Sequence, residues 1–301
     1  MALWSGIYDR FHRFAFAVFS LLAGGKGAGR EYVVNLSKTR VAEEQARRKA
    51  AAAAAQAGRE ELRGAEPFVS KFLAKHEQDP EKFIMQHVLA GCTANMVAGS
   101  DTTGISLSAI IYYLLKHPRC MRALRSEIAS FQERGLLSTP FGFKETQQMP
   151  YLQAVIKEAL RIHPATCLPM ERVVPEGGAT ISGRFFPANT IVGINSWVAH
   201  RNTQIFGADA DEFNPERWLI SDKDKLAAMN RQWIPFGMGS RTCIGRHIST
   251  LEISKLIPRI VNDFDFELSD AGSGNSWVTQ DYWFVKPRGF KVKVTSRKPE
   301  C

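Results

Sequence analysis

The feature that most constrains the fold of this 301-residue chain is one long apolar stretch between two prolines. Asp79-Pro80-Glu81 has the form of a helix start, with an acid at the N-cap and proline in the first turn, and the next proline is Pro118. The pattern predicts a helix from Glu81 to about Lys116, roughly 36 residues or ~54 Å long. A helix of this length with apolar residues on most faces must run through the middle of a domain.

The centre of this predicted helix carries residues that are costly inside a buried helix. The run Ala98-Gly99-Ser100-Asp101-Thr102-Thr103-Gly104 gathers glycine, acid and alcohol in one turn. Glycine there costs ~1 kcal/mol relative to alanine, and a buried acid costs more unless it is paired or used. The cluster is either a packing kink or a groove in which an acid and a hydroxyl face a ligand, and the clustering favours the groove.

A single cysteine in a glycine-rich loop is the second unusual feature. The loop runs from Phe236 to Gly245 and reads FGMGSRTCIG. Its three glycines predict tight turns and a close approach to something large and flat. The apolar pattern from Arg246 to Leu256 predicts a helix directly after the loop. Cys243 then lies at the start of a helix, where backbone N–H groups point at it and favour a thiolate, so it is either a nucleophile or a metal ligand.

The spacing around this cysteine argues against the nucleophile. A Cys-x5-Arg phosphatase loop requires arginine at position 249, which is Ser249. The local signatures of papain-type and caspase-type sites are missing from the sequence. A zinc site needs more cysteine or histidine nearby, and only His247 is close. A lone thiolate in such a loop best fits the axial ligand of a haem iron.

Charge and cysteine content narrow the class of protein. The net charge of +9 and the pI near 9.4 predict a basic surface. Because the chain lacks interleaved basic and aromatic residues, finger spacings and RNP-like runs, we expect no nucleic-acid partner. The five cysteines are widely spaced without a C-x-x-C pair, which indicates reduced, intracellular thiols. No segment reaches the ~18–20 apolar residues of a membrane span; Phe14 to Ala23 mimics a signal peptide or short anchor, although a core helix is favoured.

The remaining patterns predict a mainly α fold with a small β-region. Asn35 to Arg63 predicts a solvated helix with Glu43/Arg47 and Glu44/Arg48 pairs at i,i+4. Further helices are predicted over Pro118–Arg134 and Tyr151–His163, and strands over Met170–Val174, Ala179–Ile181, Phe185–Phe186, Thr190–Asn195, Phe266–Leu268 and Phe290–Thr295. The segments Gly64–Asp79 and 221–233 are expected to be connections.

Four motifs in the sequence resemble those of one family, the cytochrome P450 monooxygenases. The complete haem-binding signature F-x-x-G-x-R-x-C-x-G falls on Phe236, Gly239, Arg241, Cys243 and Gly245. The other three are Glu158-x-x-Arg161 of the family's K helix, Phe213-x-Pro215-Glu216-Arg217, and Ala98-Gly99-x-Asp101-Thr102-Thr103 of its oxygen-activating central helix. They occur in the family's order over about residues 78–298, and residues 158–218 are similar to fungal members of the pisatin-demethylase type.

The resemblance implies a role for each matching residue. Cys243 would be the proximal thiolate of haem b (iron protoporphyrin IX), in a loop to which Phe236, Gly239 and Gly245 belong. Arg241 would pair with one haem propionate, and Arg172 with a propionate from the β-region. Asp101 and Thr102 would deliver protons to bound dioxygen, and Thr102 argues for oxygen activation rather than isomerisation.

The same resemblance implies a scaffold and a set of partners. Glu158, Arg161 and Arg217 would form a buried ionic triad, since three charges out of water are tolerable only as a bonded set. A lipophilic small molecule would be hydroxylated, epoxidised or dealkylated, with electrons from an NADPH-dependent flavoprotein reductase, in fungal secondary metabolism. An acidic electron donor of this kind would suit a basic surface formed by Arg119, Arg122, Arg125, Arg231 and Arg246. The equally weighted alternative is that these residues are merely solvated. The expected pocket-lining segments are Met96–Gly99, Ala165–Pro169 and Asp281–Phe284.

The resemblance also predicts how the chain is organised. Residues 1–77 are expected to form a helical N-terminal segment that matches the family weakly, and residues 78–301 the haem-binding core. Full-length members are longer, so we expect the chain to be N-terminally truncated, without part of the roof of the substrate pocket. The family is usually anchored in the endoplasmic-reticulum membrane, and this chain shows no anchor segment. The alternative function is therefore a truncated, catalytically inactive haem-binding remnant.

Overall fold

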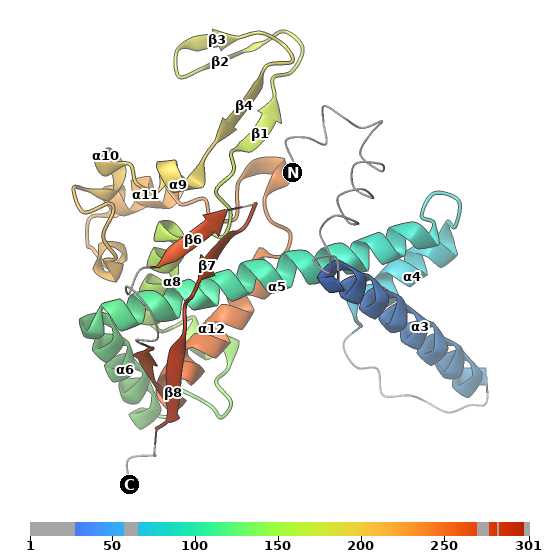
Figure 1. Ribbon diagram of the computed structural model, residues 1–301, viewed down its shortest axis with the longest axis horizontal. Coiled ribbons are helices and arrows are strands. Elements are labelled where there is room, and N and C mark those ends of the chain that lie inside the picture. Colours follow the sequence, from blue (N-terminus) through green and yellow to red (C-terminus); the bar gives the residue numbers. More distant parts are fainter. Residues whose placement is uncertain (1–27, 57–65, 270–276, 282, 298–301) are drawn as a thin grey trace. The chain divides into compact units, whose positions relative to one another are not determined.

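The computed structural model describes residues 28–56, 66–269, 277–281 and 283–297 (Figure 1). The apolar segment Phe14–Ala23 lies outside these residues. The chain divides into two compact units between Ser100 and Asp101, inside the long helix α5 (Met85–Lys116). The predicted boundary after residue 77 does not coincide with this division and stays a prediction.

The first unit contains α3 (Ala28–Gln56), α4 (Phe68–Gln78) and the beginning of α5. Its core is formed by Val41, Leu73, Val88 and Cys92. The expected Glu44/Arg48 ion pair on α3 is wrong, because Glu44 bonds Arg47 at i,i+3 and Arg48 instead reaches Glu77 of α4. The expected Glu43/Arg47 pair stays a prediction. Glu44 also accepts a hydrogen bond from Ser70, which fastens α3 to α4.

Two sequence predictions at the start of α5 are wrong. The segment around Phe68 is the helix α4 rather than a connection, and Asp79 follows its last residue instead of capping the next helix. Asp79 still caps a turn, since its carboxylate accepts from the Lys82 amide at 3.2 Å and its carbonyl from the Phe83 amide at 2.9 Å. Because this turn uses the residues around Pro80, α5 begins only at Met85.

Helix α5 is continuous through the glycine-rich turn at its centre. Residues 98 to 104 are helical throughout, so neither the kink nor the groove expected there interrupts the backbone. A methyl group added at Gly99 or at Gly104 would meet nothing within 4 Å, which means that the two glycines leave open space beside the helix. The helix is therefore not broken at this turn, and the expected groove, in which an acid and a hydroxyl face a ligand, stays a prediction.

The core of the second unit is built from helices. It comprises the end of α5 together with α6 (Pro118–Glu133), α7 (Phe143–Thr146), α8 (Pro150–Ile162) and α12 (Arg246–Asp263). Helix α8 is the most enclosed of these, with nine buried residues out of 13, and it ends where Pro164 forbids a further turn. α12 continues past Pro258, seven residues beyond the predicted end at Leu256.

Short helical segments follow α8. They are α9 (Ser196–Ala199), α10 (Thr203–Phe206), the 3-10 helix η1 (Pro215–Trp218), α11 (Lys223–Gln232) and the 3-10 helix η2 (Gly239–Arg241). The prediction of a connection over 221–233 is wrong. Asp222 caps α11 by accepting from the Lys225 amide, and the helix buries Met229.

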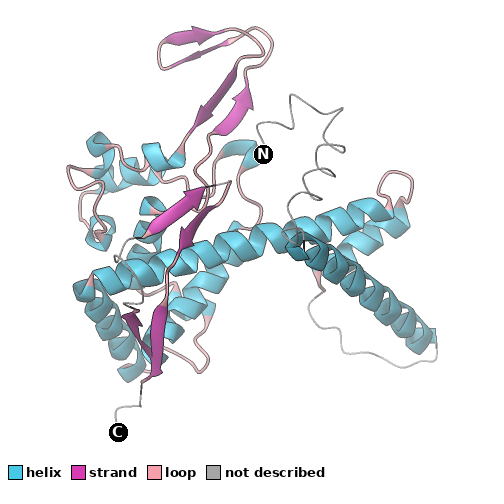
Figure 2. Cartoon of the chain, in the orientation of Figure 1, coloured by secondary structure: helices cyan, strands magenta, loops and turns pink. Residues whose placement is uncertain are grey.

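All strands among the described residues pair two by two and antiparallel (Figure 2). The ladder of β1 (Met170–Val173) with β4 (Ile191–Ile194) continues into the hairpin of β2 (Ala179–Ile181) with β3 (Arg184–Phe186). In the tail, β5 (Phe264–Leu268) pairs with β8 (Val292–Ser296), and β6 (Val278–Asp281) with β7 (Val285–Arg288). The sequence predicted β1 to β5 and β8 within two residues at each end but missed β6 and β7.

Candidate functional site

The cysteine loop, residues 236–245, turns where its glycines require it. Gly237 and Gly239 have φ values of 68° and 71°, in the left-handed region that favours glycine. Gly245 differs, because its φ is −83° and it is the N-cap of α12. A methyl group at Gly245 would lie 3.8 Å from Cys243 Sγ, so this glycine sits against the thiol instead of making a tight turn.

Cys243 is fixed through its backbone and is exposed through its side chain. Its N–H donates to the Phe236 carbonyl at 2.8 Å, which closes the loop across its two ends. Within the described part of the chain Cys243 Sγ accepts no hydrogen bond, so the N–H groups expected to point at the sulfur are not among its contacts. The neighbouring Ile244 is 92% exposed and Met238 is 56% exposed, which leaves apolar surface uncovered on both sides of the thiol.

The two arginines predicted to bind propionates lie on and beside this loop. Arg241 is the last residue of η2, is exposed, and has no polar partner among the residues described. Arg172 of β1 donates through Nη2 to the Met238 carbonyl at 3.4 Å, and through Nη1 to its neighbour's carbonyl. Met170 of the same strand also approaches the loop, because its Sδ would be 3.1 Å from a methyl group at Gly237. Strand β1 therefore brings the second guanidinium to the cysteine loop.

The acid and alcohol of α5 lie near the helix that follows Cys243. Thr103 Oγ1 donates to Ser249 Oγ on α12 at 3.2 Å, which ties this turn of α5 to the first turns after the loop. The Thr102 carbonyl accepts from Ser106 Oγ at 2.9 Å. Asp101 is 37% exposed and forms an ion pair at 2.8 Å with Lys286 of β7. Sequence reasoning missed Lys286, since nothing local marks a lysine 185 residues away as the partner of this acid.

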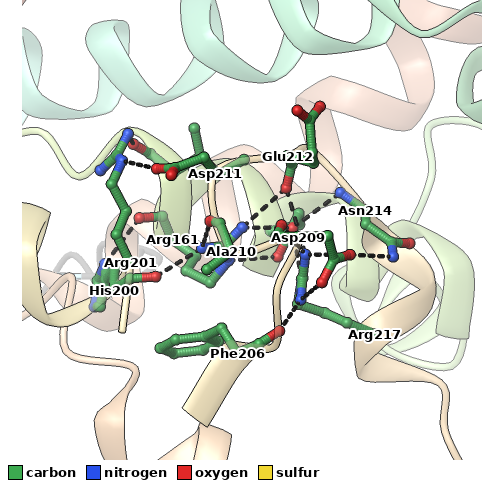
Figure 3. A network of polar contacts seen from close by, with 12 residues as sticks. Arg161, His200, Arg201, Phe206, Asp209, Ala210, Asp211, Glu212, Asn214 and Arg217 are labelled. Carbon is green, nitrogen blue, oxygen red and sulfur yellow. Dashed lines mark hydrogen bonds and ion pairs between the residues drawn. The ribbon is translucent and has the colours of Figure 1, made fainter. Parts of the chain in front are cut away.

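Glu158, Arg161 and Arg217 are brought together in the interior. Figure 3 shows the two arginines within this network of polar contacts. Glu158 is fully buried, and its carboxylate accepts from Arg161 at 2.9 Å and from Arg217 at 2.8 Å. It also accepts from the backbone N–H of Asn214 and from the Trp218 indole N–H, both at 2.9 Å. The remaining N–H groups of Arg161 donate to the carbonyls of His200, Ala210 and Glu212. Every polar group of the cluster is thus satisfied, as a buried charge requires.

Asp209 completes this cluster, and the sequence did not predict it. Its carboxylate pairs with Arg217 Nη2 at 2.9 Å and accepts from Asn214 at 2.9 Å (Figure 3). Burial opposes ionisation, but the hydrogen bonds from Asn214 and Arg217 outweigh it and lower the pKa of Asp209. Two carboxylates therefore balance two guanidiniums. A lone acid eight residues before an arginine in an irregular segment gives no signal in sequence.

The basic residues proposed for a redox partner are not equally available. Arg119 of α6 pairs with Glu216 of η1, and Arg125 pairs with Asp265 at 2.7 Å. Arg122 and Arg231 are exposed. Arg246 lies on α12 directly after the cysteine loop and donates to its neighbour His247. Two of the five cations, Arg119 and Arg125, are thus already ion-paired within the chain.

Two of the three predicted pocket segments meet. The Ala165 carbonyl accepts from the Val285 amide at 2.9 Å, Thr166 forms a bridge with Phe284, and Cys167 bonds Asp281. The third segment, Met96–Gly99, belongs to the other unit, where Ser37 Oγ lies 3.9 Å from Met96 Sδ.

Comparison with known proteins gives a consistent result. A family model described as Cytochrome P450 matches residues 31–294. A cytochrome P450 monooxygenase of Aspergillus terreus is 46% identical over 199 residues, which are 66% of this chain and 40% of that protein. Cytochrome P450 monooxygenase cicH of Emericella nidulans is 42% identical over 230 residues, 76% of this chain and 46% of that protein. Pisatin demethylase of Fusarium vanettenii is 42% identical over 237 residues, 79% of this chain and 44% of that protein.

The chain belongs to the cytochrome P450 family. The predicted fold, mainly α with a small β-region, is confirmed. The chain spans 40% to 46% of the length of these three relatives. The family match begins at residue 31 and so includes much of the segment 1–77 that the sequence predicted to match weakly. Among the described helices none is long and apolar enough to cross a membrane.

Membership of this family implies a haem cofactor, and the residues of the cysteine loop fit one. The loop presents an exposed thiol, and a methyl group at Gly239 would meet nothing within 4 Å, so the backbone is open to a close approach. Two guanidiniums lie at the same loop and match carboxylates such as propionates. On α12, Ile248 and Leu251 are 49% and 38% exposed, an apolar surface that a large flat ligand would cover.

Proposed function

We propose that this chain binds haem b through the Cys243 thiolate and acts as a monooxygenase. The substrate is a lipophilic small molecule, which is hydroxylated, epoxidised or dealkylated, in fungal secondary metabolism. Dioxygen is the second reactant, and an NADPH-dependent flavoprotein reductase supplies the electrons. Dealkylation is included because one relative is named pisatin demethylase, and two others are named monooxygenases.

The observation that carries this proposal is the exposed Cys243 side chain on a backbone held by a hydrogen bond across its loop. The 2.8 Å bond from Cys243 N–H to the Phe236 carbonyl holds the residue, while its sulfur projects without a protein partner among the described residues. A nucleophilic cysteine is commonly paired with an adjacent base, and a structural cysteine is normally buried. A fixed, exposed and unpaired sulfur is instead suited to bind an iron at a defined position.

Each further residue of the site has a part in this proposal. Haem bound through a cysteine thiolate supplies the activation of dioxygen, because the sulfur donates electron density that favours O–O cleavage. Arg241 and Arg172 would bind the two propionates. The buried cluster around Glu158 keeps α8 and the following segments rigid beneath the loop.

In this proposal, Asp101 and Thr102 deliver protons to bound dioxygen. The Thr102 hydroxyl would hold a water molecule for proton delivery to bound dioxygen, and Asp101 would resupply the proton from solvent. Asp101 is partly exposed, as a residue that exchanges protons with water must be, and Lys286 at 2.8 Å holds its carboxylate in place. Thr102→Ala should leave haem bound and divert reducing equivalents from product to hydrogen peroxide.

The direct test is the CO-difference spectrum of the reduced, haem-loaded chain. A band at the wavelength typical of thiolate ligation is expected for the unsubstituted chain, and its loss is expected in Cys243→Ser. Cys167→Ser is the matched control, since that thiol is partly buried and bonds Asp281 away from the loop. A thiolate band that survives in Cys243→Ser would refute the ligand assignment.

The same preparation separates the monooxygenase from an inactive haem-binding remnant. With a flavoprotein reductase and NADPH, the monooxygenase consumes oxygen and forms product from a lipophilic substrate. A normal thiolate band without any NADPH oxidation above the Cys243→Ser background would support the remnant and overturn the proposed activity.

A further inference from the structure

His200 is a fully buried histidine whose two ring nitrogens each have one protein partner. It follows α9, and its Nδ1 lies 2.9 Å from the Arg161 carbonyl while its Nε2 lies 2.8 Å from the Ile234 amide nitrogen. A carbonyl only accepts and an amide N–H only donates, so the ring carries its proton on Nδ1 and accepts at Nε2. The contacts therefore define a neutral imidazole of a single tautomer.

The surroundings of the ring keep it neutral. Burial is the main cause that lowers the pKa of His200 to about 4, and the positive charges of Arg161 and Arg201 act in the same direction, against the bond to the Arg161 carbonyl, which raises it. Both arginines are drawn with His200 in Figure 3. An imidazolium would carry a second N–H facing the Ile234 N–H, so protonation would break this contact.

One partner of His200, Arg161, lies in the Glu158-x-x-Arg161 motif, and the other, Ile234, lies just before the cysteine loop. Arg161 is on α8, in the buried cluster. Ile234 precedes the cysteine loop, and its carbonyl accepts from the Gly237 amide at 3.0 Å. Next to it, Trp233 Nε1 donates to the Lys157 carbonyl of α8 at 2.9 Å. The loop entrance is thus held to α8 at two adjacent residues, and only the Ile234 contact passes through a titratable side chain.

We propose that His200 is a positioning residue for the cysteine loop. Its neutral ring holds the Ile234 amide at a fixed place relative to α8, and through the Gly237 and Phe236 backbone bonds it sets where Cys243 stands. The effect on Cys243 as a haem ligand rests on the proposed function, whereas the contact itself does not.

Two substitutions by side-chain amides distinguish the contact made by Nε2 of His200 from the contact made by Nδ1. The longer side-chain amide introduced by His200→Gln reaches the position of Nε2 and can accept from Ile234 N–H. The shorter amide introduced by His200→Asn reaches only the position of Nδ1 and leaves Ile234 N–H without a partner. Amide hydrogen exchange at Ile234 in the chain as expressed should be at least about tenfold faster in His200→Asn, and within about twofold of the original rate in His200→Gln.

The matched control is His163→Asn. His163 is also fully buried, but it bonds the Val285 carbonyl and the Trp277 indole, not the loop. Exchange at Ile234 should be unchanged in this variant. Equal exchange at Ile234 in both His200 variants, or faster exchange in the control, would overturn the positioning role.

A second readout follows the consequence for ligation. After haem loading, His200→Asn should show a mixture of thiolate and neutral-ligand CO bands, with the thiolate band restored in His200→Gln. If no variant and no unsubstituted chain shows a thiolate band, the proposed function fails while the exchange result still decides the role of His200. A full thiolate band in His200→Asn despite fast exchange at Ile234 would contradict the link to Cys243.

Discussion

Glu158 and Cys243 lie in the same compact unit and in two motifs of the same site, yet their environments are opposite. Glu158 is fully buried and accepts five hydrogen bonds from Arg161, Arg217, Asn214 and Trp218. Cys243 is exposed, and its neighbours Met238 and Ile244 present apolar surface to solvent. One region is complete with protein groups alone, whereas the other is shaped for a ligand.

This difference in environment separates residues that hold the backbone of the site in place from residues that bind its ligand. A satisfied buried charge cluster fixes backbone segments, because the guanidinium N–H groups of Arg161 and Arg217 bind backbone carbonyls as well as carboxylates. An exposed thiol on a fixed backbone has little effect on the stability of the fold, and its sulfur stays accessible to a ligand. We therefore expect substitutions in the cluster to act on folding, and substitutions in the loop to act on ligand binding.

The largest effect is expected from breaking the cluster at its centre. Glu158→Gln leaves two buried guanidiniums without their full counter-charge and should lower the free energy of unfolding by about 3–5 kcal/mol. Urea unfolding followed by circular dichroism measures this loss. Glu252→Gln, an exposed position on α12, is the control and should change stability by less than about 0.5 kcal/mol. Equal stability of the two variants would contradict the scaffold role.

The next effect is a dependence of stability on pH from two buried histidines. Burial lowers the pKa of His163 and of His200 to about 4 from an ordinary value of 6.5. In the unfolded chain the two imidazoles become protonated as the pH falls through 6.5. In the folded chain they stay neutral until the pH reaches about 4. Stability should therefore fall between these two pH values, by up to about 3 kcal/mol for each histidine, and the two groups should add little further change at lower pH.

Urea unfolding at about pH 7, 5.5 and 4.5, values chosen to span the interval in which the two histidines act, measures this dependence. His200→Gln should remove about half of the slope, because glutamine does not titrate. A slope that is the same in the variant and in the original chain would show that His200 is protonated in the folded state.

A smaller effect is expected at the edge of the cluster. Asp209→Asn removes the ion pair with Arg217 at 2.9 Å but keeps an oxygen acceptor, so the loss should be about 1 kcal/mol. Asp211→Asn in the same segment is the matched control, since this acid is 77% exposed and pairs with Arg201 at the surface. It should cost at most about 0.5 kcal/mol. A larger loss of stability in Asp211→Asn than in Asp209→Asn would contradict the assignment of Asp209 as the second carboxylate of the cluster.

The smallest effect on folding is expected in the loop itself. Ile244→Ala removes a side chain that is 92% exposed and should change stability by less than about 0.5 kcal/mol. Ile253→Ala on the adjoining helix removes a fully buried side chain and should cost about 2–5 kcal/mol. Thermal unfolding of the two haem-free variants makes the comparison, and a large loss for Ile244→Ala would mean that the loop is packed without a ligand.

Local patterns in the sequence predicted most of the fold and the types of residue in the site. Proline and glycine punctuation located α6, α8 and the β1 to β4 region closely. The pattern failed at α4, where a short apolar piece suggested a connection, and at α11, where polar and charged residues did. At Asp79 it failed because an acid followed by proline caps a turn as readily as a helix.

Contacts between distant residues were beyond the reach of the sequence. Asp209, Lys286 and His200 are ordinary residues locally, and their roles come from partners brought near by folding. The tautomer of His200 in particular follows only from knowing that one nitrogen faces a carbonyl and the other an amide. Motifs predict which residues meet a ligand, whereas the groups that hold those residues in place emerge from the structure.

The most direct test of this account is amide hydrogen exchange of the chain with and without haem. The α8 amides around Glu158 should be strongly protected in both states, because their environment is complete without the ligand. Amides of residues 237–245 should exchange fast in the haem-free chain and become protected when haem binds. Unprotected α8 amides in the haem-free chain, or loop amides that are equally protected in both states, would contradict it.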